Sequence, residues 1–197
     1  MCLKASSKAD FTGVAPTLKG LGATTGLAFG QVTKALEVEA GSYDIRIVAP
    51  NAADCGTSLA GLPDFNGNTL TAGSSVTVGA IGFVTKPEGN TNGFTLKAFA
   101  NDAAKPEATK TKLRIVHTSP DTPAVDAGLL SGDVFTALAT NFAYPNAWNA
   151  AGANTQGYAT VDKLSNATLA VRATGQTAIA LTIPGVTTNG ADIFTGW

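Results

Sequence analysis

The amino-acid sequence predicts an all-β protein made of two tandem, antiparallel β-sandwich-like repeats. Short runs of alternating apolar and polar residues recur along the chain, which is the period of a strand with one buried face. The 197 residues include 22 glycines and 9 prolines, so turns are frequent and long helices are not expected. The second half of the chain repeats the order of strand signals in the first half, which indicates an internal duplication.

The first strand signals form a predicted hairpin. Residues 35–39 read A-L-E-V-E and residues 43–48 read Y-D-I-R-I-V, so both runs alternate. Ala40, Gly41 and Ser42 break the pattern between them. Two alternating runs around a break that contains glycine predict two antiparallel strands joined by a turn.

Two more strands are predicted before residue 100. Residues 75–83 read S-V-T-V-G-A-I-G-F, and the two glycines, Gly79 and Gly82, indicate a bulge or a close approach of another backbone. Residues 93–99 alternate so that apolar side chains share one face.

A polar connector separates the predicted repeats. Residues 101–112 contain Pro106 and lack apolar periodicity, and a new strand signal starts at Leu113. We therefore expect a first repeat over residues 1–104, a linker over 105–112 and a second, partial repeat over 113–197.

The predicted repeats correspond in order but not in extent. Residues 157–172 match the predicted hairpin at 35–48, and residues 188–197 match residues 71–80. The strand signal at 113–125 has no counterpart before Met1, and the strand at 93–99 has none after Trp197. The first repeat is thus expected to lack its N-terminal strand and the second its C-terminal strand. Either the chain is a fragment or neighbouring molecules supply the missing strands.

Charge and hydropathy exclude several classes of function. The formal net charge is −1 and the lysines and arginines are scattered, so no nucleic-acid partner is expected. No apolar run approaches the roughly 20 residues of a membrane span, and no signal peptide opens the chain. Charged residues are 14% of the sequence, against about 25% in ordinary globular proteins. This low charge is typical of exported β-proteins, so we expect a secreted or cell-surface protein.

The two cysteines, Cys2 and Cys55, favour a disulfide in an exported protein. Such a bond would close a loop of roughly 50 residues and stabilise the fold by about 3–4 kcal/mol. Two free thiols in a cytosolic protein are the alternative. The spacing is unlike a C-x-x-C redox motif, and no cofactor or tetrahedral metal site is expected.

Residues 116–126 read V-H-T-S-P-D-T-P-A-V-D, which resembles the opening of the DUF4397 domain family, V-H-A-S-P-D-A-P-A-V-D. Residues 26–32, G-L-A-F-G-Q-V, and 38–46, V-E-A-G-S-Y-D-I-R, are similar to its middle section, and residues 71–82 to a later strand pair. The resemblance covers most of 26–99 and 113–126. It implies an exported, often tandem β-sandwich of unknown function, and it carries no known catalytic residues.

The single histidine lies inside that motif. His117, Ser119 and Asp121 suggest a compressed Ser-His-Asp site for ester hydrolysis, but three residues within five positions, interrupted by Pro120, rarely converge head to tail. We favour a polar turn in which Ser119 or Asp121 accepts backbone hydrogen bonds. Asp121 and Asp126 are also candidate Ca²⁺ ligands, without a D-x-D-x-D-G loop to support them.

Three aromatic residues of the second repeat, Tyr144, Trp148 and Tyr158, are candidate ligand-binding residues. Exposed on loops, their rings would stack on a sugar or form an interface hot spot. Packing in the core is the alternative.

These observations favour a non-catalytic extracellular module that binds a surface protein, a polysaccharide or copies of itself. In its sharpest form, strand addition between copies completes each sandwich and builds a filament. A secreted hydrolase acting on an extracellular ester or polymer is the alternative function, and a plain spacer domain of a longer surface protein is a third.

Overall fold

The computed structural model describes residues 1–197, and nearly all of its regular structure is β. Twelve strands form four sheets, in which every strand pair but one is antiparallel, as predicted. The one helix, α1 (Thr17–Gly20), has four residues. The chain divides into two compact units, Met1–Ser74 and Ser75–Trp197.

The first unit contains one three-stranded antiparallel sheet, in the order β1-β2-β3. Its strands are β1 (Cys2–Ala5), β2 (Gly41–Arg46) and β3 (Phe65–Leu70). A small core of Cys2, Phe11, Val48 and Cys55 packs beside the sheet. Four residues are few for a unit of this size, so the first unit depends on covalent and polar contacts as well as on burial.

The predicted hairpin at residues 35–48 is wrong in its first strand. Residues 43–46 do lie in a strand, β2, but residues 31–39 lie in no strand. The reason is that β2 already pairs with β1 along one edge and with β3 along the other. A strand has only two edges, so residues 35–39 have no place beside β2.

The second unit begins with an antiparallel hairpin, β4 (Val76–Ile81) and β5 (Thr95–Ala100), close to the strands predicted there. The close approach predicted at Gly82 is present. Gly82 has a φ of +83°, and a Cβ at this position would lie 2.3 Å from the Gly93 carbonyl oxygen.

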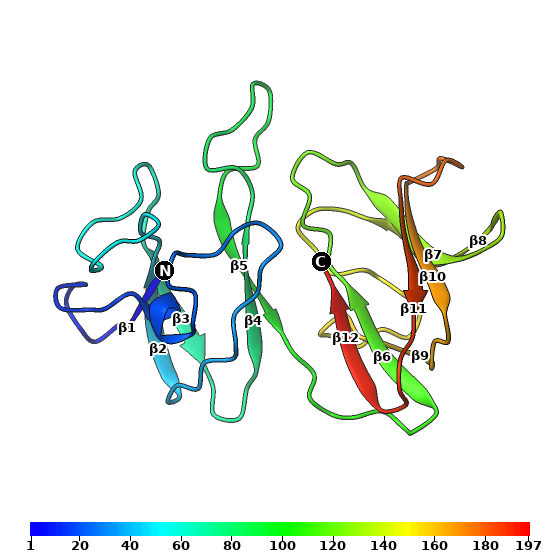
Figure 1. The fold of residues 1–197 in the computed structure, drawn as a ribbon, viewed down its shortest axis with the longest axis horizontal. Helices are drawn as coiled ribbons and strands as arrows, with labels where there is room; N and C mark the ends of the chain where they lie inside the picture. Colours follow the sequence, from blue (N-terminus) through cyan, green and yellow to red (C-terminus); the bar gives the residue numbers. More distant parts are fainter. The chain divides into compact units, whose positions relative to one another are not determined.

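The remaining strands of the second unit form two sheets around one core. The first has the order β11-β10-β7-β8 and the second the order β12-β6-β9 (Figure 1). The first sheet consists of β7 (Val125–Ser131), β8 (Val134–Phe142), β10 (Ala167–Ala173) and β11 (Leu181–Val186). The second consists of β6 (Lys110–Ile115), β9 (Ala159–Asp162) and β12 (Asp192–Gly196). Buried residues of both sheets, among them Leu113, Ala159, Val125 and Leu169, belong to one apolar cluster, as in a β-sandwich.

Strand β6 is the central strand of its sheet. It pairs in parallel with β12 and antiparallel with β9, and the parallel pair is visible as the red and green arrows of Figure 1. Because β6 begins at Lys110, the last three residues of the predicted linker belong to a strand.

The two units share one pattern of strand order. β1-β2-β3 in the first unit and β7-β10-β11 in the second are antiparallel throughout, and the central strands carry Arg46 and Arg172 near their ends. Arg46 lies opposite Cys2, and Arg172 lies opposite Asp126. The predicted duplication and its boundary at residues 105–112 both stay predictions.

None of the helices in the structure has the length and apolar character required to cross a membrane.

Candidate functional site

The most unusual surface of the chain is the segment before β2, residues 27–39, which we call the open segment. Its apolar side chains are exposed to solvent: Phe29 fully, Val32 by 79% and Leu36 by 43%. Residues 32–39 make no backbone–backbone hydrogen bond, although residues 36–39, L-E-V-E, alternate apolar and polar side chains as in a strand. Exposed apolar side chains combined with unpaired backbone groups are features of a binding edge.

A tight turn forms the tip of the open segment. The amide of Gln31 donates to the carbonyl of Ala28 at 3.1 Å, and the Gln31 side chain accepts from the amide of Ala28 at 2.9 Å. Both bonds are made within four residues, so the turn holds itself together. Its effect is to present Phe29 to solvent.

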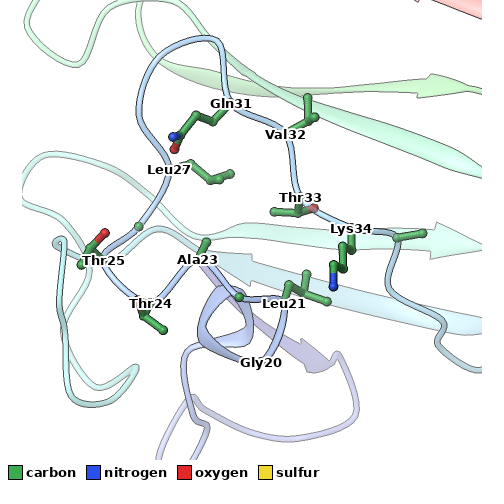
Figure 2. A pocket seen from close by; sticks show the side chains of 13 residues that line it. Gly20, Leu21, Ala23, Thr24, Thr25, Leu27, Gln31, Val32, Thr33 and Lys34 are labelled. Atoms are coloured by element: carbon green, nitrogen blue, oxygen red, sulfur yellow. The ribbon is translucent and has the colours of Figure 1, made fainter.

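An open groove of about 740 Å³ runs between the two arms of this loop. One arm is formed by residues 20–27 and the other by residues 31–35. Figure 2 shows Leu21, Leu27, Val32 and Lys34 along these arms. Apolar side chains, three threonines, Gln31 and one cation, Lys34, therefore line the groove.

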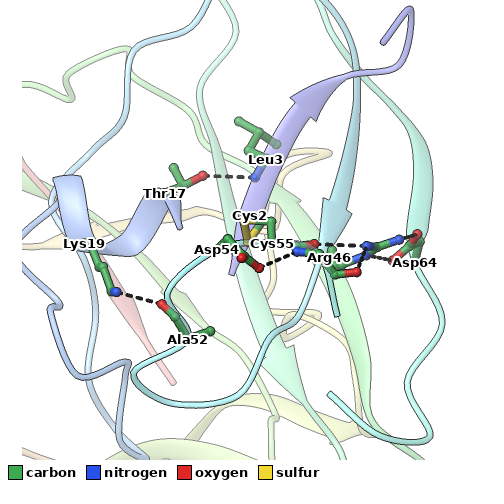
Figure 3. The surroundings of a disulfide bond; sticks show 10 residues. Cys2, Leu3, Thr17, Lys19, Arg46, Ala52, Asp54, Cys55 and Asp64 are labelled. Atoms are coloured by element: carbon green, nitrogen blue, oxygen red, sulfur yellow. Dashed lines mark hydrogen bonds and ion pairs between the residues drawn. A yellow bond between two sulfur atoms is a disulfide. The ribbon is translucent and has the colours of Figure 1, made fainter. Parts of the chain in front are cut away.

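The chain that leads into the open segment is anchored in the first unit. The disulfide between Cys2 and Cys55 is present, as predicted. Thr17 accepts a hydrogen bond from the amide of Leu3 at 2.9 Å, and Lys19 donates to the carbonyl of Ala52 at 2.7 Å (Figure 3). These bonds hold α1, from which the loop departs.

At its far end the open segment is held by one hydrogen bond. The Tyr43 hydroxyl donates to the Glu39 carbonyl at 2.7 Å. Glu37 and Glu39 are exposed, and their carboxylates make no ion pair. The segment therefore combines two apolar residues, Leu36 and Val38, with two free carboxylates at alternate positions.

The sheet of the first unit contains an ionic cluster, in which the pair of Lys4 and Asp44 is buried. The Lys4 ammonium lies 2.5 Å from the Asp44 carboxylate, which also accepts from Ser6 and from the amide of Gly67. These hydrogen bonds, above all the one from Lys4, lower the pKa of Asp44 to about 2. Arg46 forms a bidentate salt bridge with Asp64, in which both hydrogen bonds are 2.7 Å long. The cluster fixes β1, β2 and β3 to one another.

The histidine motif forms a polar turn in the structure. His117 Nε2 lies 3.0 Å from the Pro123 carbonyl, and its Nδ1 accepts a hydrogen bond from the amide of Ser119 at 3.4 Å. The Ser119 hydroxyl lies 2.9 Å from Asp121 and 2.7 Å from Thr122. Both imidazole nitrogens thus contact backbone, and the serine hydroxyl contacts neighbouring side chains rather than His117.

Two of the three candidate aromatic residues lie in the core. Trp148 and Tyr158 are buried; the indole donates to the Gly157 carbonyl at 2.9 Å, and the Tyr158 hydroxyl lies 3.0 Å from Thr195. Tyr144 is partly buried and its hydroxyl has no hydrogen-bond partner; burial raises its pKa. The rings of Trp148 and Tyr158 therefore offer no exposed face for stacking on a sugar.

The two candidate calcium ligands have different surroundings. Asp126 is buried; burial pushes its pKa up, but hydrogen bonds from the amide of Asn141, from Thr174 and from Arg172 outweigh this, so the pKa is lowered overall. Asp121 is exposed and contacts Ser119. No group of three or more His, Cys, Asp or Glu side chains lies close enough together to hold a metal ion.

Sequence reasoning missed one central buried group, Arg114. Its guanidinium donates to the carbonyls of Ala100 and Gln156 and to the side chain of Asn101, and it stacks 4.3 Å from the Tyr158 ring. A single arginine in a strand gives no signal of burial. The open segment was also missed as a binding edge, although its alternation was the signal that predicted a strand.

One comparison with known proteins gives a match. A family model described as "Domain of unknown function (DUF4397)" matches residues 5–128. No curated protein and no solved structure matches this chain.

Proposed function

The chain belongs to the DUF4397 family, and we propose that it is a non-catalytic extracellular module that binds other molecules, copies of itself included, by β-strand addition. One observation carries the proposal. Residues 32–39 make no backbone pairing within their own molecule and expose their apolar side chains, and residues 36–39, L-E-V-E, alternate like a strand.

Strand addition satisfies both features of the open segment. An added strand supplies donors and acceptors for the unpaired amides and carbonyls, and its side chains cover Val32, Leu36 and Val38. Backbone pairing gives affinity, whereas the alternating side chains give selectivity. When the segment of one copy binds a different surface of the next, the contact does not close and a filament grows.

The disulfide and the composition support the extracellular part of the proposal. Disulfides persist in oxidising compartments and are rare in the cytosol. The bond between Cys2 and Cys55 is buried in the small core of the first unit, where it is structural. The low proportion of charged residues is typical of exported β-proteins.

The contacts of His117 favour a binding role over hydrolysis. In a Ser-His-Asp site the imidazole accepts the serine hydroxyl proton, whereas here both ring nitrogens contact the backbone of their own turn. Replacement of His117 by Ala, with ester and glycoside substrates screened on both proteins, tests the hydrolase alternative. Activity that is present in the wild type and lost in the variant would establish it.

Sedimentation velocity over a wide range of protein concentrations tests self-assembly. We expect the wild type to associate as concentration rises, and a Val32→Asp/Val38→Asp variant to remain monomeric because its new charges oppose burial of the segment. Val84→Asp/Val134→Asp is the matched control, since these two valines are 53% and 66% exposed outside the open segment.

The result can go against the proposal in two ways. A wild-type protein that is monomeric at every concentration excludes self-assembly. Association that the control pair abolishes, and the open-segment pair leaves intact, moves the interface to another surface.

A further inference from the structure

The open segment has a similar stretch in the second unit, which suggests the kind of strand that it binds. Residues 36–39, L-E-V-E, have the same alternation as β9, residues 159–162, A-T-V-D, and we align the two stretches in this register. Both stretches alternate an apolar with a polar residue, and both precede the central strand that carries Arg46 or Arg172. In β9 the apolar residues Ala159 and Val161 are more buried than the polar ones.

Strand β9 pairs antiparallel with β6, and this register is known residue by residue. Asp162 lies opposite Lys110, Val161 opposite Thr111, Thr160 opposite Lys112, and Ala159 opposite Leu113. The Lys110 ammonium lies 2.7 Å from the Asp162 carboxylate. Of the two lysines of β6, Lys110 thus contacts β9 directly, whereas Lys112, opposite Thr160, forms its ion pair with Asp102 instead.

The same register on the open segment places two lysines opposite two carboxylates. Glu39 takes the position of Asp162, and Glu37 takes that of Thr160. The first unit thus has one more acidic side chain facing the partner than β9 has, and neither carboxylate has an ion-pair partner of its own. Opposite charges directly across a strand pair favour that pairing.

We propose, on the basis of the strand-addition function above, that residues 36–39 bind an antiparallel strand of the pattern Lys-x-Lys-apolar from another polypeptide. The two lysines face Glu39 and Glu37, and the residues at the other positions cover Val38 and Leu36. The strand is one that is free in its own molecule, because β6 of a folded copy is already paired with both β12 and β9.

A synthetic peptide tests this inference on the full-length protein. Residues 109–117, T-K-T-K-L-R-I-V-H, are labelled with a fluorophore and titrated with the protein while anisotropy is measured. We expect saturable binding, with slower hydrogen exchange at the amides of residues 35–39. The same peptide with both lysines replaced by glutamate should bind about tenfold more weakly or less.

Reversing the charges on the protein gives the decisive control. A Glu37→Lys/Glu39→Lys variant should prefer the glutamate peptide, whereas Glu88→Lys/Asp133→Lys, which changes two exposed residues elsewhere, should keep the wild-type preference. Binding that is equal for both peptides, or a preference that Glu37→Lys/Glu39→Lys does not reverse, overturns the proposal.

The two proposals fail separately. A protein that is monomeric at all concentrations but binds the lysine peptide loses self-assembly and keeps the strand pattern. A protein that associates through the open segment and ignores the peptide keeps strand addition and loses the strand pattern.

Discussion

At the scale of single residues, the first unit is held together by polar groups that the sequence pattern does not reveal. Lys4 and Asp44 are both buried, on adjacent strands and directly opposite each other. Lys4 also contacts the Lys8 carbonyl and lies 5.2 Å from the Phe11 ring. A buried charge that keeps its partner is tolerated, whereas removal of one partner leaves the other uncompensated.

Asp44→Asn should change how stability depends on pH. The pKa of Asp44 is lowered from 3.8 to about 2 in the folded protein, so its stabilising effect is complete above about pH 5 and is lost as the pH falls towards 2. We expect the variant to be less stable at neutral pH and to lose less stability than wild type on acidification. Urea unfolding at pH 7, 4 and 2.5 measures both effects; parallel pH profiles would contradict the role of Asp44.

Arg114→Lys should destabilise the second unit by about 2–3 kcal/mol, because a lysine does not reproduce the planar set of donors. The guanidinium donates to four acceptors, on Ala100, Asn101, Gln156 and Thr195, and stacks on Tyr158. Burial lowers the pKa of Arg114, in keeping with its dry surroundings. Guanidinium unfolding followed by tryptophan fluorescence gives the change, and a loss below about 0.5 kcal/mol would show that the hydrogen bonds are replaceable.

At the scale of strands and loops, most elements were predictable from period and punctuation. β2, β4, β5, β6, β9, β10 and β12 lie at or near alternating runs. β1 is four residues long and has no clear alternation, so nothing indicated that it would take one edge of β2. Which strands pair depends on which segments occupy the two edges of each strand. The edges of β2 are occupied by β1 and β3, so residues 35–39 stay unpaired.

Glycine packing between strands gives an element-scale prediction at Gly128 in β7. A Cβ there would lie 2.1 Å from the Thr136 carbonyl oxygen of β8, next to an irregularity in the β7–β8 register. Gly128→Ala should therefore push the strands apart and cost about 2 kcal/mol or more. Gly20→Ala is the control, because its Cβ would meet nothing within 4 Å. Thermal unfolding compares the two; equal transition temperatures would mean that β8 moves aside freely.

The candidate site was predictable only in part, for a related reason. The sequence pointed to His117 and to Trp148, the rare residue types on which chemistry most often depends. Burial and hydrogen bonding were not readable from the pattern, and they place Trp148 in the core. The open segment carries ordinary strand residues, and only its missing partner in the fold makes it a candidate.

At the scale of the whole molecule, the chain consists of two compact units whose hydrophobic cores differ in size. The second unit has a large apolar cluster that joins two sheets. The first unit has four residues in its cluster, two of which are the cysteines of the disulfide. Units with different cores need not unfold in one step.

Reduction of the disulfide should therefore destabilise only Met1–Ser74. The bond spans 53 residues, and closing such a loop restricts the unfolded chain by about 4 kcal/mol. We expect calorimetry to show two transitions, of which reductant, or a Cys2→Ser/Cys55→Ser variant, lowers one strongly and leaves the other in place.

Hydrogen exchange assigns those transitions, because the second unit contains no cysteine. In the reduced protein, amides of β1, β2 and β3 should lose protection while those of β6, β7 and β10 keep it. A single transition that shifts as a whole would show that the units unfold together. Since the open segment lies in the first unit, the same reduction should also weaken strand addition, which makes the disulfide a requirement for the proposed binding edge.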